Sequence, residues 1–158
     1  MATLPGIGAK MIKLNPHWSV EKAGSVPLEA ALSINDFKGK RLIITLPGAG
    51  GFCNKELDLV KEHADKFKSA GVDEVIVVVG TDILTNAGRG LPNLLQDIDL
   101  EFAKANKLQL DGLKSRYLNR AAIAVDANGN QVLREDAPLL GCRTADALVG
   151  AAKKAFSN

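Results

Sequence analysis

The sequence predicts an α/β sandwich in which a mixed central sheet is flanked by helices. Residues 41–46, 75–79 and 121–125 are apolar runs rich in β-branched or small side chains, a composition typical of buried strands. An amphipathic stretch separates the first two runs, and a strand–helix–strand unit of about 40 residues forms a right-handed crossover between parallel strands. Turn-forming residues follow the third run and predict an antiparallel partner, so the sheet is mixed.

The chain length of 158 residues corresponds to a single domain, 1–158. A net charge of +2 without any basic run argues against nucleic acid and anionic membranes as partners. No apolar stretch approaches the ~18 residues of a membrane span, and the N-terminus lacks the apolar core of a secretory signal. We therefore expect an intracellular protein, in the cytoplasm or the mitochondrion.

The first half of the chain contains the predicted crossover. Residues 1–28 are rich in Pro and Gly, which indicates an irregular N-terminal arm with a short hairpin. Residues 33–37 predict a short helical turn, and the strand 41–46 comes next. The run Pro-Gly-Ala-Gly-Gly at 47–51 must form a turn, because no regular element tolerates that density of Pro and Gly.

A helix is predicted from Cys53 to Ala70, because its apolar residues recur at helical spacing. Its apolar stripe consists of Leu57, Val60, Ala64 and Phe67. Gly71 follows at the position where a left-handed cap ends a helix, and the strand 75–79 comes next.

The second half predicts a loop at 81–93 and then a helix at 94–107. That helix would turn Leu95, Ile98, Phe102 and Ala105 inward. After the strand 121–125, the turn residues Asp-Ala-Asn-Gly predict a hairpin with residues 131–134. Thr144 is the expected N-cap of a last helix that ends at Phe156.

Cys53 is the residue that we expect to carry the chemistry. A cysteine in the first turn of a helix faces unpaired backbone N–H groups and the positive end of the helix dipole, and both favour the thiolate. The alternative is that Cys53 is a small buried apolar residue, as intracellular cysteines often are.

The second cysteine supports a redox interpretation. Cys142 lies in the segment Leu-Gly-Cys-Arg-Thr, a predicted loop before the last helix. Two cysteines far apart in the sequence do not make a disulfide scaffold. A reactive thiol and a distant loop thiol are, however, what a resolving disulfide requires, because the first sulfur is oxidised to sulfenic acid and the second condenses with it.

Four segments resemble the type-5, or atypical two-cysteine, peroxiredoxins, whose plant members are called type II. Residues 37–49 (FKGKRLIITLPGA) resemble the start of that family, and residues 62–76 resemble the helix and strand after its peroxidatic cysteine. Residues 112–125 resemble the segment that carries the family's active-site arginine, and residues 142–148 match the region of its resolving cysteine. The resemblance implies a thioredoxin-like (peroxiredoxin) fold.

The resemblance also implies a mechanism, a thiol-dependent peroxidase that reduces hydrogen peroxide or alkyl hydroperoxides. Cys53 would be the peroxidatic cysteine, Arg120 would stabilise its thiolate and the peroxide, and Cys142 would be the resolving cysteine. Thioredoxin or glutaredoxin would serve as reductant, the protein would be a homodimer, and no cofactor or metal would be needed. The implied substrate-binding residues are Pro47, Gly50, Gly51 and Phe52.

The peroxidatic loop departs from the family pattern Pro-x-x-x-Thr-x-x-Cys. Pro47 precedes Cys53 by one residue fewer, and Gly50 or Gly51 stands where the threonine is expected. In the family, that threonine hydroxyl orients the peroxide. The departure leaves an alternative open: a peroxiredoxin fold with weakened or lost activity that acts as a structural or binding subunit of a larger assembly.

Two other classes of site are less well supported by the sequence. The glycine-rich turn Gly48-Ala-Gly-Gly lies between a predicted strand and a predicted helix, an order that resembles a phosphate-binding loop. However, the third glycine of the motif G-x-G-x-x-G would fall at Cys53. No Walker-type Gly-Lys-Ser/Thr occurs either. The two histidines, His17 and His63, have no ligand spacing to each other or to the cysteines, so no metal site is predicted.

Overall fold

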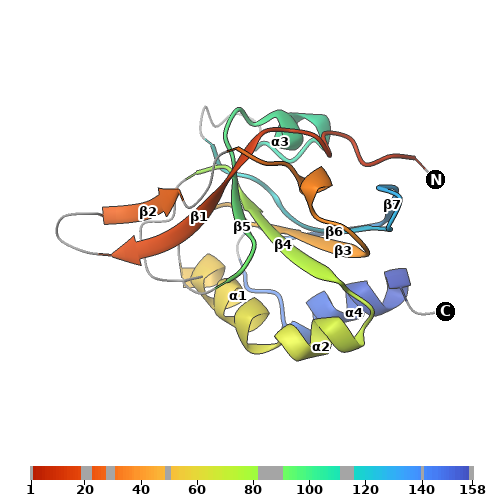
Figure 1. Ribbon diagram of the computed structural model, residues 1–158. Coiled ribbons are helices and arrows are strands. Elements are labelled where there is room, and N and C mark those ends of the chain that lie inside the picture. The colour runs from red at the N-terminus through yellow and green to blue at the C-terminus, as the bar shows by residue number, and fades with distance from the viewer. Residues whose placement is uncertain are drawn as a thin grey trace.

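The computed structural model contains a mixed sheet with helices on both faces (Figure 1). The structure describes residues 2–18, 23–27, 31–48, 51–81, 91–110, 116–139 and 141–156. In this part of the chain, seven strands form one sheet in the order β2-β1-β5-β4-β3-β6-β7. The strands are β1 (Met11–Trp18), β2 (Ala23–Pro27), β3 (Arg41–Thr45), β4 (Glu74–Val79), β5 (Leu94–Asp97), β6 (Arg120–Val125) and β7 (Gln131–Ala137).

The centre of the sheet is formed by strands that are covered on both faces. All residues of β3 and β6 are buried, and β3 pairs in parallel with β4 and antiparallel with β6. One face packs against α1 (Gly51–Glu62), α2 (Ala64–Ser69) and α4 (Ala145–Phe156), while α3 (Glu101–Ala105) lies on the other face (Figure 1). The predicted mixed α/β sandwich is therefore confirmed.

The crossover from β3 through α1 and α2 to β4 is confirmed, but its helix is interrupted. A continuous helix from Cys53 to Ala70 was predicted, whereas the structure ends α1 at Glu62 and starts α2 at Ala64. His63 leaves the helical conformation, with φ −107° and ψ 23°, and its ring Nδ1 lies 2.9 Å from the carbonyl of Leu59. Gly71 follows α2 with φ +97°, the left-handed conformation that the sequence predicted there.

The predicted helix at 94–107 is wrong in its first half. Leu94 to Asp97 form β5, parallel to β4, because the two buried leucines extend the sheet. Leu100 has φ 57° and separates this strand from the short helix α3. The buried Asp97 carboxylate accepts hydrogen bonds from the backbone N–H groups of Phe102 and Ala103, so it caps α3. Ala105, expected to be buried, is exposed.

The N-terminal arm is more regular than predicted. The short hairpin expected within residues 1–28 is present as β1 and β2, which pair antiparallel. In addition, β1 pairs antiparallel with β5 and joins the central sheet, with Met11 opposite Asp97. Met11 and Leu14 are buried, and this burial explains why the segment does not remain an irregular arm.

The remaining predicted elements are confirmed where the structure describes them. Residues 34–36 form a 3₁₀ turn, and β6 and β7 form the predicted antiparallel hairpin. The backbone N–H of Ala147 donates to Thr144 Oγ1 at 3.0 Å, as expected for the N-cap of α4. Residues 82–90 of the predicted loop lie outside the described residues. None of the helices that are described has the length and apolar character needed to cross a bilayer.

Candidate active site

Cys53 lies where the chain turns from β3 into α1. The helix begins at Gly51, so Cys53 is in its first turn, as predicted. The side chain is 5% exposed and packs in the apolar cluster beneath α1. The first backbone N–H groups of a helix have no partner within the helix, and they supply positive potential to a sulfur at this place.

Arg120 is the first residue of β6 and contacts Cys53 directly. Because β6 runs antiparallel to β3 with Ala121 opposite Thr45, Arg120 lies beside the carboxyl end of β3, where α1 begins. Its Nη2 is 3.3 Å from Cys53 Sγ, and its Nε donates to the carbonyl of Leu139 at 2.9 Å. The Arg120 side chain is only 2% exposed, so its positive charge acts on the sulfur with little screening by water.

Glu56 is a member of this cluster that the sequence analysis missed. It lies one turn after Cys53 on α1 and is fully buried. Its Oε1 accepts a hydrogen bond from Arg120 Nη1, and its Oε2 accepts one from Arg143 Nε at 2.5 Å. The signal in the sequence was a carboxylate beside the apolar stripe of α1, since residues three apart on a helix share a face.

Arg143 is the second residue that the sequence analysis missed. It precedes α4, and its backbone N–H donates to Glu56 Oε2 at 3.0 Å. Its Nη2 donates to the carbonyl of Thr45 at 3.0 Å and to Glu56 Oε1 at 3.3 Å. Arg143 therefore fastens the loop before α4 to both α1 and β3.

The buried cluster around Cys53 holds more positive than negative charge. Arg120 and Arg143 carry two positive charges, and the buried Glu56 carboxylate balances one of them. A buried charge without a partner costs several kcal/mol, on the order of the penalty for breaking a buried ion pair. The Cys53 sulfur contacts Arg120, so it lies beside the positive charge that Glu56 does not balance.

Cys142 lies in the same loop as Arg143 and is partly buried. Its Sγ is 3.4 Å from the carbonyl oxygen of Arg143. Burial raises the pKa of the Cys142 thiol, and the negative charge of Glu56 raises it further, although Arg120 opposes this effect. Both cysteines are free thiols in this structure, and Cys142 is held in the protonated form at neutral pH.

Comparison with known proteins places the chain in a family. The sequence model of the redoxin family matches residues 24–138, which is most of the chain. The chain belongs to the redoxin family. No curated protein sequence matches it significantly.

Solved structures show which fold this redoxin has. The reduced Prx3 of Vibrio vulnificus in complex with H2O2 is similar, with a TM-score of 0.69, 22% identity and coverage of 96% of both chains. Mycobacterium tuberculosis AhpC has a TM-score of 0.69 and 17% identity, covering 99% of this chain and 94% of AhpC. The reduced 2-Cys peroxiredoxin of Plasmodium vivax has a TM-score of 0.62 and 19% identity, over 94% and 79% of the two chains. The fold is therefore thioredoxin-like, of the peroxiredoxin type.

The other candidate site residues of this redoxin are placed only in part. Pro47 is half-buried after β3, and the backbones of Gly51 and Phe52 begin α1. The side chain of Phe52 and the whole of Gly50 lie outside the described residues. Gly48 is buried, and a Cβ there would lie 3.1 Å from Tyr117 Cε1, so this ring packs closely against the loop before Cys53.

Thr45 does not replace the hydroxyl of the threonine that the loop before Cys53 lacks, and Arg116 does not replace Arg120. The Thr45 hydroxyl donates to the carbonyl of Asn119 at 2.7 Å and is already engaged in the sheet. Arg116 donates from Nε to the carbonyl of Gly80 at 2.5 Å and from Nη2 to that of Asp97 at 2.8 Å. Arg116 therefore joins the ends of β4 and β5, whereas Arg120 contacts the sulfur. Among the described residues, no group of His, Cys, Asp and Glu could hold a metal ion.

Alkylation of Cys142 is expected to require alkaline pH. Because its folded pKa lies above the ordinary value of 9.0, less than half of Cys142 is thiolate at pH 9.0, and its rate of reaction with iodoacetamide still rises above that pH. Mass spectrometry of the Cys142 peptide after timed labelling measures this rate. The urea-unfolded chain is the control, and identical pH profiles for folded and unfolded protein would contradict the burial effect.

Proposed function

We propose that this redoxin is a thiol peroxidase of the peroxiredoxin type, in which Cys53 reduces hydroperoxides. The observation that carries the proposal is the contact of 3.3 Å between Cys53 Sγ and Arg120 Nη2 inside a buried cluster with Glu56 and Arg143. A nucleophilic cysteine needs a group that favours its thiolate and a charge that meets the developing oxyanion. Arg120 is suitably placed for both roles.

The first step oxidises Cys53. Its thiolate attacks the terminal oxygen of the hydroperoxide, the S–O bond forms, and the O–O bond breaks. The sulfur becomes a sulfenic acid, and the leaving alkoxide or hydroxide takes up a proton to give an alcohol or water. Arg120 stabilises the charge that develops on the leaving oxygen, and the first N–H groups of α1 bind the peroxide oxygens.

In the second step, Cys142 acts as the resolving cysteine. Its sulfur attacks the Cys53 sulfenic acid, a disulfide forms within the chain, and one water leaves. Because burial raises the pKa of Cys142, this step should accelerate as the pH rises toward that pKa. An external dithiol such as thioredoxin or glutaredoxin then reduces the Cys53–Cys142 disulfide and is itself oxidised to a disulfide. The order of segments resembles the type-5, atypical two-cysteine subtype.

Peptide mapping after peroxide treatment tests this function. One equivalent of hydrogen peroxide should give a Cys53–Cys142 disulfide within one chain, and the Cys142→Ser variant should accumulate Cys53 sulfenic acid, trapped with dimedone. Oxidation of Cys142 first, or no oxidation at Cys53, would contradict the peroxidase assignment. Over-oxidised Cys53 beside a free Cys142 in the unmodified protein would remove the resolving role alone.

The alternative of an inactive binding or structural subunit has less support. The described residues still bring Cys53 and Arg120 together with two further charged groups, and a binding role alone does not require that arrangement. The threonine missing from the loop is not replaced by Thr45, whose hydroxyl bonds to Asn119. We therefore expect orientation of the peroxide to rest on the backbone N–H groups and Arg120.

A further inference from the structure

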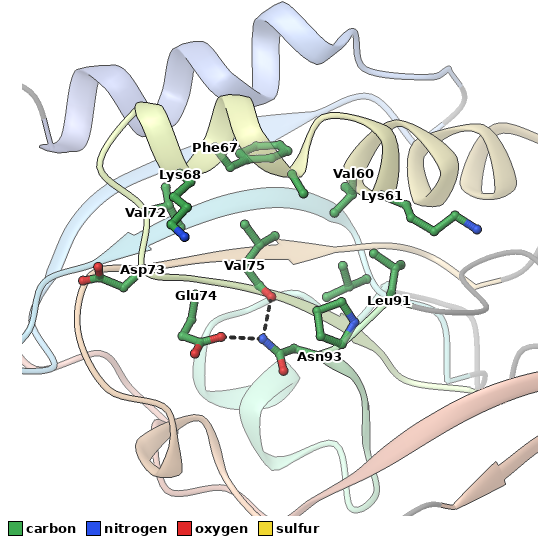
Figure 2. Close-up of a pocket in the computed structure, with 13 residues that line it drawn as sticks. Val60, Lys61, Phe67, Lys68, Val72, Asp73, Glu74, Val75, Leu91 and Asn93 are labelled. Carbon is green, nitrogen blue, oxygen red and sulfur yellow. Dashed lines mark hydrogen bonds between the residues drawn. The ribbon is translucent and has the colours of Figure 1, made fainter.

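A pocket lies on the helical face of the sheet, and Cys53 is not among the residues that line it. It has a volume of about 310 Å³ and is bounded by the end of α1, by α2, by β4 and by the residues that lead into β5 (Figure 2). Its walls are mainly apolar and include Val60, Phe67, Val72, Val77 and Leu91. Pockets of about 300 Å³ and above accept small ligands, and an apolar cavity of about half this volume holds benzene.

Charged groups of both signs gather at one end of this pocket. Figure 2 shows three charged side chains at the same end: Lys68 on α2, Asp73 just before β4, and Glu74 at the start of β4. Glu74 Oε2 accepts from the amide of Asn93 at 2.7 Å, and this hydrogen bond fixes the direction of the carboxylate. Within the residues that the structure describes, no side-chain hydrogen bond or ion pair of the Lys68 ammonium occurs. Opposite charges thus line one rim without pairing.

We propose that this pocket binds a small zwitterion with an apolar body, of the chemical class of an apolar or aromatic α-amino acid. The α-carboxylate would pair with Lys68 and the α-ammonium with Glu74, while the side chain enters the apolar part between Phe67, Val60 and Leu91. A carboxylate alone would pair with Lys68 but would lie beside the like charge of Glu74. An ammonium alone would pair with Glu74 but would lie beside the like charge of Lys68. Complementarity to both signs therefore distinguishes the zwitterion from a simple acid or amine.

The expected affinity is modest. An amino acid of about twelve non-hydrogen atoms, bound with ordinary ligand efficiency, has a Kd of about 1 mM. Each rim ion pair is solvent-exposed and contributes about two- to fivefold in affinity. The pocket shares α1 with Cys53 but uses none of the residues proposed for peroxide chemistry, so the two proposals fail or succeed separately.

Chemical-shift titration of the ¹⁵N-labelled protein with a matched series of ligands tests the proposal. L-Phenylalanine carries both charges, 3-phenylpropionate has only the carboxylate, and 2-phenylethylamine has only the ammonium. We expect saturable shifts at residues of α2 and β4, with phenylalanine at least twofold tighter than either singly charged analogue. Equal or tighter binding of one analogue would overturn the zwitterion assignment, and the absence of saturation by all three would overturn the site.

Variants separate the rim from the apolar part. Lys68→Met and Glu74→Gln should each lower the affinity for phenylalanine about two- to fivefold. Lys66 lies on α2, as Lys68 does, but outside the pocket, so Lys66→Met should leave this affinity unchanged. Ala64 is exposed at the rim, so Ala64→Phe should fill the pocket and abolish binding without disturbing the core. Unchanged affinity in Ala64→Phe, in a variant that keeps the native spectrum, would contradict the location.

Discussion

Replacement of Arg120 by methionine is expected to slow the oxidation of Cys53 by hydrogen peroxide by about 10²- to 10³-fold. Removal of one preorganised group that stabilises charge in a buried site has effects of this size. Arg120 Nη2 lies 3.3 Å from Cys53 Sγ, and the guanidinium is almost completely buried. Methionine occupies a similar volume without charge, so the loss reports on electrostatics, and rapid-quench oxidation followed by thiol alkylation measures it.

Two variants serve as controls for the Arg120 experiment. Arg134→Met removes an arginine of β7 that pairs with Asp136 and has no contact with Cys53, so its rate should match that of the unmodified protein. Arg120→Lys keeps the positive charge but cannot contact both Cys53 and Glu56, and an intermediate rate is expected. If Arg120→Met oxidises as fast as Arg134→Met, Arg120 has no role in the reaction.

Replacement of Glu56 by glutamine is expected to lower the free energy of unfolding by about 3–5 kcal/mol, because loss of one partner leaves buried charges uncompensated. Glu56 is the acceptor for Arg120 and for both the backbone and the side chain of Arg143. Glutamine has nearly the same shape, but only one of its two terminal atoms accepts a hydrogen bond. Urea unfolding of the reduced protein, followed by circular dichroism, measures the change.

The matched control for Glu56 is on the same helix. Glu62 is exposed at the end of α1, so Glu62→Gln should change the free energy of unfolding by less than about 0.5 kcal/mol. The Glu56→Gln variant should also release the loop of Arg143, which makes Cys142 more accessible to alkylation at a given pH. Equal stabilities of the two variants would show that Glu56 does not hold the cluster together.

The central strands could be predicted because the amino-acid composition of each strand already indicates that it is buried. Residues of β3, β4 and β6 form apolar runs, and such runs are typical of strands that are covered on both faces. The four residues of β5 carry too little information of this kind, since Leu94 and Leu95 suit a helix as well as a strand. Their pairing with Val77 and Val78 decides the outcome, and it depends on contacts far away in the sequence.

The candidate site likewise contains residues that the sequence could predict and residues that it could not. The position of Cys53 followed from the order of strand, glycine-rich turn and helix, and Arg120 was assigned from a resemblance in residues 112–125 before the structure brought its guanidinium to the sulfur. Glu56 and Arg143 escaped prediction because their role depends on the meeting of α1, β6 and the loop before α4. No spacing along the chain reveals that a carboxylate will lie between two guanidiniums that are far from it in the sequence.

The most direct test of the central claim is the rate at which Cys53 reacts with hydrogen peroxide. Reduced protein is mixed with peroxide at neutral pH, the reaction is quenched with an alkylating agent, and the Cys53 peptide is quantified by mass spectrometry, with Cys53→Ser as the blank. Stabilisation by the buried cluster predicts a second-order rate constant at least about 10²-fold above that of free cysteine under the same conditions. A rate equal to that of free cysteine would show that the contact with Arg120 does not activate this thiol.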